Sequence, residues 1–111
     1  MTEDRGERIA RNEVAYRDVN EAIRKGRTEQ TAETPRPFVC ECGQLGCNQL
    51  VELTLAEYEG IRSHSRRFFM LDGHEIPDVE SVLERHERYI VAEKRSAQAR
   101  IVEETNPRRD A

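Results

Sequence analysis

All three cysteines of the chain, Cys40, Cys42 and Cys47, fall within eight consecutive residues. Gly43 and Gly46 lie between the second and third of them, and glycine allows the backbone to turn more sharply than other residues do. A Cys-x-Cys-x4-Cys array of this kind is typical of a tight metal-binding loop, in which the sulfurs converge on one ion. Structural zinc is tetrahedral and takes four ligands. The pattern therefore predicts a zinc site (Zn2+) that needs one more ligand.

The fourth ligand must come from outside the array, from His64, His74, His86 or water. We favour His74, because it follows Gly73 in a predicted turn at the end of a strand, from which its ring can reach a hairpin. We expect His86 within a helix and His64 at an exposed helix end. The predicted metal ligands are therefore Cys40, Cys42, Cys47 and His74. The alternatives are three cysteines with a different ligand, and a chain without a stable metal.

The size of the chain makes a structural metal more plausible. Its 111 residues allow one domain, and its charged ends leave only about 60 residues for the compact part. A domain of that size buries only ~60% of its unfolded surface, so a metal would contribute much of its stability.

The sequence contains no apolar run of the ~18 to 20 residues that a membrane span needs, and its polar start does not resemble a signal peptide. We therefore expect no membrane association and a cytoplasmic location. Thiols stay reduced in the cytoplasm, so closely spaced cysteines there indicate metal or redox ligands before disulfides.

Residues 1–27 are rich in Arg, Glu and Ala and predict an amphipathic helix that stops near Gly26. Ile9, Tyr16 and Ile23 recur every seven residues, and Val19 occupies an intermediate position, which gives a narrow apolar stripe. The stripe can pack on the protein's own sheet. It can also dock to a protein partner or to a second copy, and this is the role that we assign to it.

The middle of the chain alternates strand and helix signals. Residues 28–37 predict an extended, proline-containing linker. Residues 38–53, the cysteine hairpin, contain two short strands on either side of the Cys-Gly turn. A capping box at Thr54 predicts a short helix over 55–63, and the apolar run at 68–71 predicts a buried strand.

The last part of the chain begins with Asp78, a good N-cap, so we expect a helix that carries Val79, Val82, Leu83 and His86. Residues 88–94 predict a final strand. Residues 95–111 predict a frayed or disordered tail, with a frayed helix over 96–104.

These elements predict an α+β fold: a small, mostly antiparallel sheet with two short helices, a long N-terminal helix and a zinc-knuckle hairpin. The predicted organisation is an amphipathic helix (1–27), a linker (28–37), a zinc-knuckle α+β domain (38–94) and the tail (95–111).

Several of these segments together resemble a group of small, uncharacterised actinobacterial proteins. The shared pieces are Arg-Asn-Glu and Val-Asn-Glu in the N-terminal helix, Phe-x-Cys-x-Cys-x4-Cys, Leu-Thr-x-x-Glu-Tyr, and Gly-His-Glu-x-Pro. They stand here at residues 11–13, 19–21, 38–47, 53–58 and 73–77. The resemblance covers roughly residues 8–94 and implies a shared module, but it brings no activity with it.

The charge of the chain argues against general nucleic-acid binding. Its net charge is −4, and residues 28–94 contain thirteen Asp and Glu against seven Lys and Arg, whereas phosphate contacts need a basic face. Basic and aromatic residues do alternate at 66–69 and 85–89, a pattern that nucleic-acid surfaces use. A small nucleic-acid-associated or transcription-linked regulator is therefore the alternative function.

The sequence contains no complete catalytic motif. Glu75 beside His74 is a conceivable general base if zinc keeps an open position, and oxidation of the thiols with loss of zinc is a separate possibility. Neither reading has a specific motif such as His-Glu-x-x-His. We therefore predict a non-enzymatic regulatory or adaptor module, stabilised by zinc, that binds a protein partner.

Overall fold

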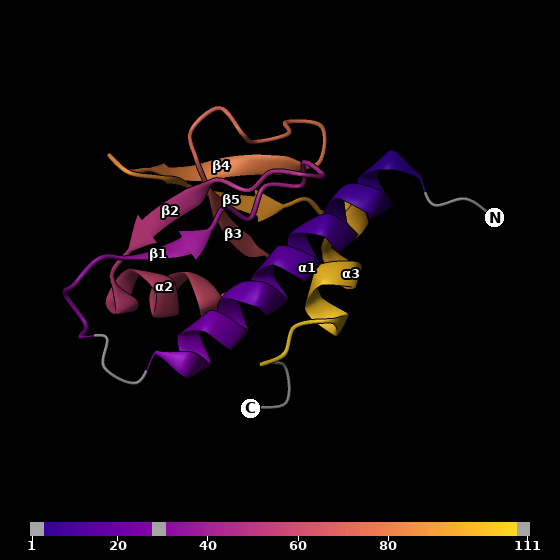
Figure 1. Ribbon diagram of the computed structural model, residues 1–111. Helices are drawn as coiled ribbons and strands as arrows, with labels where there is room; N and C mark the ends of the chain where they lie inside the picture. Colours follow the sequence, from indigo (N-terminus) through magenta and orange to yellow (C-terminus); the bar gives the residue numbers. More distant parts are fainter. Residues whose placement is uncertain (1–3, 28–30, 109–111) are drawn as a thin grey trace.

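The computed structural model describes residues 4–27 and 31–108, except for the side chains of residues 96 and 97 (Figure 1). The described chain contains both helices and strands, which confirms the α+β class. In chain order the elements are α1 (Arg5–Gly26), β1 (Arg36–Val39), β2 (Leu50–Leu53), α2 (Leu55–Arg62), β3 (Arg67–Met70), β4 (Glu80–Arg85), β5 (Ile90–Lys94) and α3 (Ser96–Glu104). None of the described helices is long and apolar enough to cross a membrane.

The strands form two small antiparallel sheets instead of one. β1 pairs with β2, and in the second sheet β5 lies between β3 and β4. A register shift between Val82 and Glu84 interrupts the pairing of β4 with β5. The backbone N–H of Glu41 donates to the carbonyl oxygen of Phe69 at 2.9 Å, which joins the cysteine hairpin to β3.

Three aromatic rings form the centre of the core. Phe38 and Tyr58 are stacked with ring centroids 4.5 Å apart, and Phe69 meets both rings edge-on. All three residues are fully buried. They come from β1, α2 and β3, so this cluster brings together the two sheets and the short helix that connects them.

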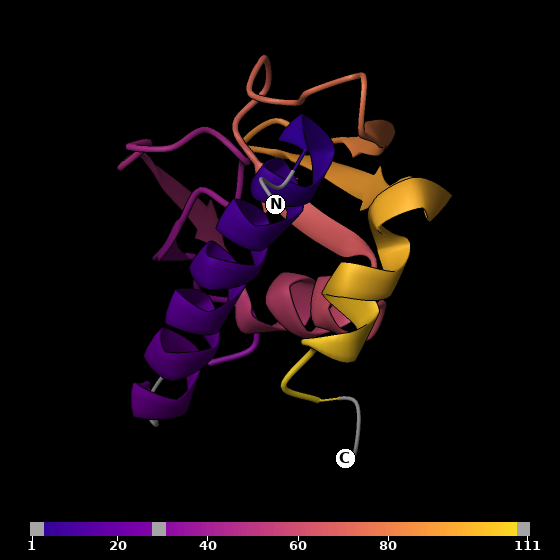
Figure 2. The same cartoon turned by 90° about the vertical axis from the view of Figure 1, so that its right-hand side faces the viewer.

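The helix α1 runs diagonally across the sheets with α3 at its side (Figure 1). In the view turned by 90°, α1 and α3 flank the ribbon of α2 (Figure 2).

The side chain of Asp4 caps α1 by accepting the N–H of Glu7 at 2.7 Å. The expected capping box of α2 is present, with Thr54 and Glu57 each accepting the other's backbone N–H.

The buried face of α1 is mainly polar, which the apolar stripe did not predict. Its buried residues are Ile9, Ala10, Glu13, Arg17, Asn20 and Glu21. Of the predicted stripe, only Ile9 is buried, Tyr16 and Ile23 are half-buried, and Val19 is 46% exposed. Each residue turns the helix by about 100°, which places the stripe and the buried face at adjacent positions around the helix. The two faces overlap only in part.

Residues 80–85 form strand β4, so the helix that we predicted after Asp78 is wrong. Asp78 is exposed and caps no helix. The register with β5 places Val82 opposite Ala92, and this cross-strand pairing outweighs the local helical pattern, as tertiary contacts often do. The final strand, β5, is confirmed.

The segment that we expected to fray forms the helix α3, in which Ala99 and Val102 are buried. Arg17 of α1 donates to the carbonyl oxygen of Val102 at 2.9 Å. Further along, Arg108 donates to Glu21 of α1 at 2.8 Å and to Glu59 of α2 at 2.6 Å. The C-terminal part of the described chain is therefore held to both helices.

A buried lysine, Lys94 of β5, lies between two buried carboxylates. Its ammonium pairs with Glu13 of α1 and lies 3.2 Å from Glu80 of β4. Burial raises the pKa of Glu13 well above its usual value, and the facing Glu80 raises it further, while Lys94 lowers it. The protonated form of Glu13 is therefore favoured on folding.

We expect Glu13→Gln to change the pH dependence of stability. A carboxyl whose pKa rises on folding contributes stability that is complete below its unfolded pKa, near 4.5, and lost as pH rises through the folded value. Glutamine has no proton to lose, so urea unfolding should show the stability of the variant rising relative to that of the unaltered chain as the pH rises above about 5. A difference that does not change with pH would contradict the assignment. Lys94→Met, which removes the ammonium that contacts both Glu13 and Glu80, should instead cost ~3–5 kcal/mol.

Candidate metal centre

The four predicted ligands converge in the structure. The ligand atoms of Cys40, Cys42, Cys47 and His74 all lie within 4.8 Å of one another. The Nδ1 atom of His74 is 3.6 Å from the sulfur of Cys40 and 3.8 Å from that of Cys47. Cys40 and Cys42 are fully buried, and the other two ligands are half-buried. Three sulfurs and one imidazole nitrogen thus form a compact group that can hold a metal ion.

Two tight turns bring the ligands together. In the loop between β1 and β2, Gly46 has a φ of 85°, and the N–H of Cys47 donates to the carbonyl oxygen of Gln44 at 3.2 Å. In the loop after β3, Gly73 has a φ of 91°, directly before His74. A positive φ is accessible to glycine at little cost. These glycines therefore shape the two loops that carry the ligands.

The thiols differ in how readily they lose a proton. The pKa of Cys40 lies below its usual value, chiefly because the thiol of Cys42 donates to its sulfur, with a further bond from the N–H of Leu71 at 3.4 Å. The pKa of Cys42 is raised, chiefly because its thiol donates to Cys40. Metals bind thiolates, so binding here would release protons. Backbone N–H groups directed at a ligating sulfur are also typical of metal–thiolate sites.

The residue between the first two cysteines anchors the site to the core. Glu41 is fully buried, and its carboxylate accepts two hydrogen bonds from Arg62 of α2, at 2.6 and 2.9 Å. It also accepts from Asn20 of α1 at 2.8 Å and from the N–H of Phe69 in β3 at 3.3 Å. One carboxylate thus connects the metal-binding segment to two helices and to the second sheet.

The helix α1 contacts the cysteine hairpin along its backbone. The side chain of Asn20 both donates to the carbonyl oxygen and accepts from the N–H of Val39, each at 2.8 Å. Asn12 donates to the carbonyl oxygen of Gly43 at 3.1 Å. A Cβ atom on Gly43 would lie 2.3 Å from the side chain of Ile9. A side chain at this position would therefore force Ile9 to move.

The other histidines lie outside the group. His86 makes a 2.7 Å contact with Glu84 and stacks on the ring of Tyr89, with centroids 4.6 Å apart. His64 is exposed after α2. The spacing of the cysteines and the turn before His74 were sufficient to predict which four side chains converge. Glu41, Arg62 and Asn20 were missed, because nothing in the pattern of a charged residue indicates that it is buried.

We expect His74→Ala to weaken metal binding, because it removes one of four ligands. Titration of the reduced chain with Co2+ should show sulfur-to-metal absorption in both proteins, with weaker binding and an altered ligand-field spectrum in the variant. His86→Ala, which changes a histidine outside the group, is the matched control and should behave like the unaltered chain. Equal affinity and identical spectra for the His74 variant would exclude His74 as a ligand.

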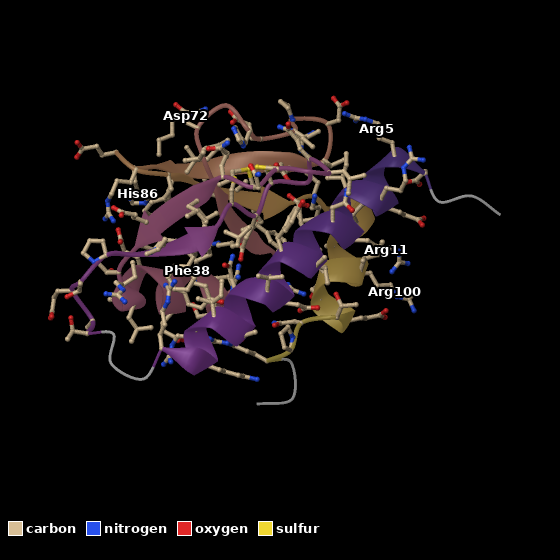
Figure 3. The ribbon with its side chains drawn as sticks, viewed as in Figure 1. Arg5, Arg11, Phe38, Asp72, His86 and Arg100 are labelled. Carbon is tan, nitrogen blue, oxygen red and sulfur yellow. The ribbon has the colours of Figure 1, made fainter. Side chains whose placement is uncertain are left out.

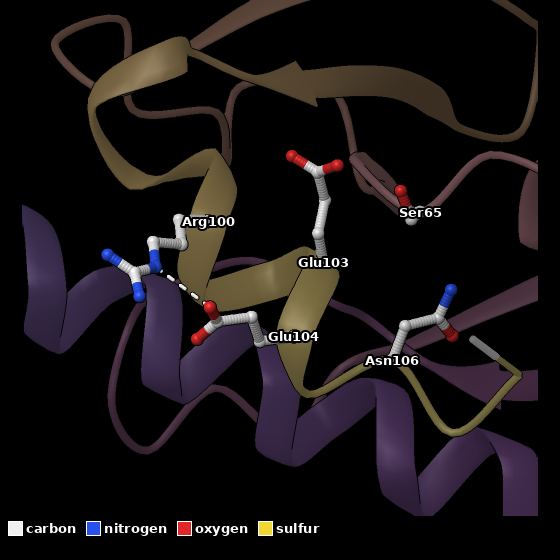
Figure 4. A pocket seen from close by; sticks show the side chains of 5 residues that line it. All are labelled: Ser65, Arg100, Glu103, Glu104 and Asn106. Atoms are coloured by element: carbon white, nitrogen blue, oxygen red, sulfur yellow. Dashed lines mark hydrogen bonds and ion pairs between the residues drawn. The ribbon is translucent and has the colours of Figure 1, made fainter. Parts of the chain in front are cut away.

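Two hollows indent the surface, one beside the candidate centre and one beside α3. One of about 410 Å³ is lined in part by Cys47 and His74, two of the four predicted ligands. The other, of about 530 Å³, lies beside α3 and is lined by Ser65, Arg100, Glu103, Glu104 and Asn106 (Figure 4). Its two carboxylates are already paired, with Arg100 at 2.8 Å and with Arg66 at 3.0 Å. We assign no binding role to this second hollow.

Comparison of the chain with protein-family models, with curated proteins and with solved structures found no match.

Proposed function

We propose that the chain is a non-enzymatic, zinc-stabilised module that binds a protein partner. The convergence of three sulfurs and one imidazole nitrogen carries the proposal. Zinc–sulfur bonds of about 2.3 Å and zinc–nitrogen bonds of about 2.0–2.1 Å place the sulfur and nitrogen atoms of a tetrahedral site about 3.6 Å apart. The separations of 3.6 and 3.8 Å from His74 Nδ1 to two of the sulfurs fit this geometry.

The ligand set favours a structural role for the metal. Soft thiolates select zinc over magnesium or calcium, and the cysteines are free thiols, as they would be in the cytoplasm, where we place the chain. Four protein ligands leave no position for a catalytic water. Glu75, the conceivable base, accepts the N–H of Gly73 at 2.9 Å and lies 3.6 Å from Arg85. Its carboxylate thus helps to hold the loop that carries His74.

The proposed contact with a protein partner uses the exposed part of the α1 stripe. Val19 is 46% exposed, and the half-buried Tyr16 and Ile23 lie at i−3 and i+4 from it on the same side of the helix. Ile9, the remaining member of the predicted stripe, is buried and belongs to the core. The partner-binding segment is therefore shorter than the sequence pattern suggested.

The structure weakens the alternative function, nucleic-acid binding, because the aromatic residues at 66–69 and 85–89 that suggested it are buried. Phe68 is 1% exposed and Phe69 is fully buried, so neither ring is free to stack on a base. Tyr89 is 3% exposed, and the neighbouring Arg88 pairs with Glu57 at 3.0 Å. Both basic–aromatic segments therefore take part in the protein's own packing.

Affinity capture with the full, metal-loaded chain tests the proposal. The bait is used unaltered, as Val19→Lys and as Leu83→Lys, a matched exposed aliphatic residue of β4 that is 44% exposed. We expect one protein to be retained by the unaltered chain and the Leu83 variant but lost with Val19→Lys, and to bind again as a purified protein. Zinc is measured on the same baits. Retention by all three baits would exclude the α1 surface, and retention of nucleic acid alone would favour the alternative.

A further inference from the structure

A basic hollow of about 420 Å³ lies between the first turns of α1 and the loop of the cysteine hairpin. Arg5, Arg8 and Arg11 line it from α1, and Ile9, Leu45 and Ile76 supply apolar surface. Figure 3 shows Arg5 and Arg11 extending from the exposed side of α1. We call this the arginine hollow.

The charge of the arginine hollow is opposite to that of the chain as a whole. The chain has a net charge of −4, yet the described residues that line the hollow include three arginines and no carboxylate. Arg5 pairs with Asp78 at 2.9 Å, but both side chains are more than half exposed, at 59% and 75%. Such surface pairs contribute little, so Arg5 can exchange this partner for the carboxylate of a ligand.

The hollow also carries an exposed apolar anchor point. Leu45 is 88% exposed in the loop between the second and third cysteines. Buried contacts hold that loop in place, since Gly43 lies directly against Ile9. An exposed leucine beside arginines fits a protein-binding surface, in which arginine is enriched and the buried centre is apolar.

We propose that the arginine hollow binds an acidic segment of a partner protein, whose carboxylates meet Arg5 and Arg8 while an apolar side chain packs on Leu45 and Ile76. The inference rests on the proposed function, because the occupant is part of a protein. A hollow of this size takes a few side chains. A nucleic-acid strand would extend beyond the hollow along a chain whose net charge is −4, which disfavours phosphate contacts.

The geometry of α1 connects this hollow to the proposed partner surface. Arg8, Arg11 and Val19 are spaced i, i+3 and i+11, and therefore lie on one side of the helix. All three are exposed. The distance from Arg8 to Val19 is about 16 Å along the axis at 1.5 Å per residue. One extended partner segment can span it.

Selection from a displayed random peptide library, with the zinc-loaded full chain as bait, tests the inference. We expect enriched peptides to contain Asp or Glu around one large apolar residue. Synthetic peptides from the selection should bind Arg8→Glu and Leu45→Ser about ten-fold more weakly or worse. Arg100→Glu, at an exposed arginine outside the hollow, should bind them like the unaltered chain. Circular dichroism and zinc content confirm that the variants are folded.

Each of the other outcomes would overturn one part of the proposal. Enriched peptides that bind Arg8→Glu unchanged would place the binding site elsewhere and leave the protein-partner function standing. No enrichment at all, together with no captured partner, would reject both. A single-stranded oligonucleotide that binds in an Arg8-dependent way would assign the hollow to nucleic acid. Self-association that Arg8→Glu abolishes would assign it to a second copy of this chain.

Discussion

Replacing Cys42 with serine is expected to abolish both metal binding and the folded state at 25 °C. Structural zinc in small domains binds with an apparent free energy of ~10–16 kcal/mol, whereas a whole domain is stable by only ~5–15 kcal/mol. A variant that no longer holds zinc therefore loses an energy comparable to the total stability. Circular dichroism, with zinc content measured on the same sample, should show loss of helix and of metal together.

Leu45→Ser is the matched control for this variant. It changes a residue of the same loop that is 88% exposed and contributes no ligand, so folding and zinc content should both be retained. Chelation of the unaltered chain should reproduce the effect of Cys42→Ser, and refolding should follow the addition of Zn2+ but not Mg2+. A Cys42 variant that stays folded with full zinc content would contradict the account.

Arg62→Met is expected to destabilise the protein by ~3–5 kcal/mol, because it leaves the carboxylate of Glu41 buried without its cation. Arg62 and Glu41 have side chains that are 2% and 0% exposed. Chemical denaturation of the zinc-loaded chain measures the change. Since Glu41 lies between two of the proposed ligands, Cys40 and Cys42, the variant should also bind zinc more weakly.

Arg66→Met provides the comparison at the surface. Arg66 pairs with Glu103 at 3.0 Å, with side chains 44% and 43% exposed, and such pairs contribute ~0–1 kcal/mol. The double variant Glu41→Leu with Arg62→Met should recover part of the lost stability, because it buries no unpaired charge. Equal costs for Arg62→Met and Arg66→Met would show that the buried pair has no special role.

The sequence predicted the elements whose signals are local. The capping box fixed the start of α2, and the glycines between and beside the ligands indicated the turns of the metal centre. The choice of His74 combined two local signals, the spacing of the cysteines and the turn before the histidine, although His74 lies 27 residues after Cys47. Each signal depends on residues within a few positions of one another, so the pattern contains it.

The features that were missed depend on distant partners. Residues 80–85 pair with β5, and this pairing turned a helical pattern into strand β4. The buried side of α1 is set by Glu13, Arg17 and Asn20, whose partners lie on β5, α3 and β1. A hydrophobicity pattern assigns such charged and polar residues to the protein surface. Only the fold shows that their charges and amides are paired inside the protein.

X-ray absorption spectroscopy at the zinc edge, on protein purified from its native cell without added metal, tests the central claim most directly. We predict a first shell of three sulfurs at about 2.3 Å and one nitrogen at about 2.0–2.1 Å. His74→Ala should lose the imidazole signal while His86→Ala keeps it. A metal-free protein, or a shell with two sulfurs or fewer, would contradict the claim that Cys40, Cys42, Cys47 and His74 form one zinc site.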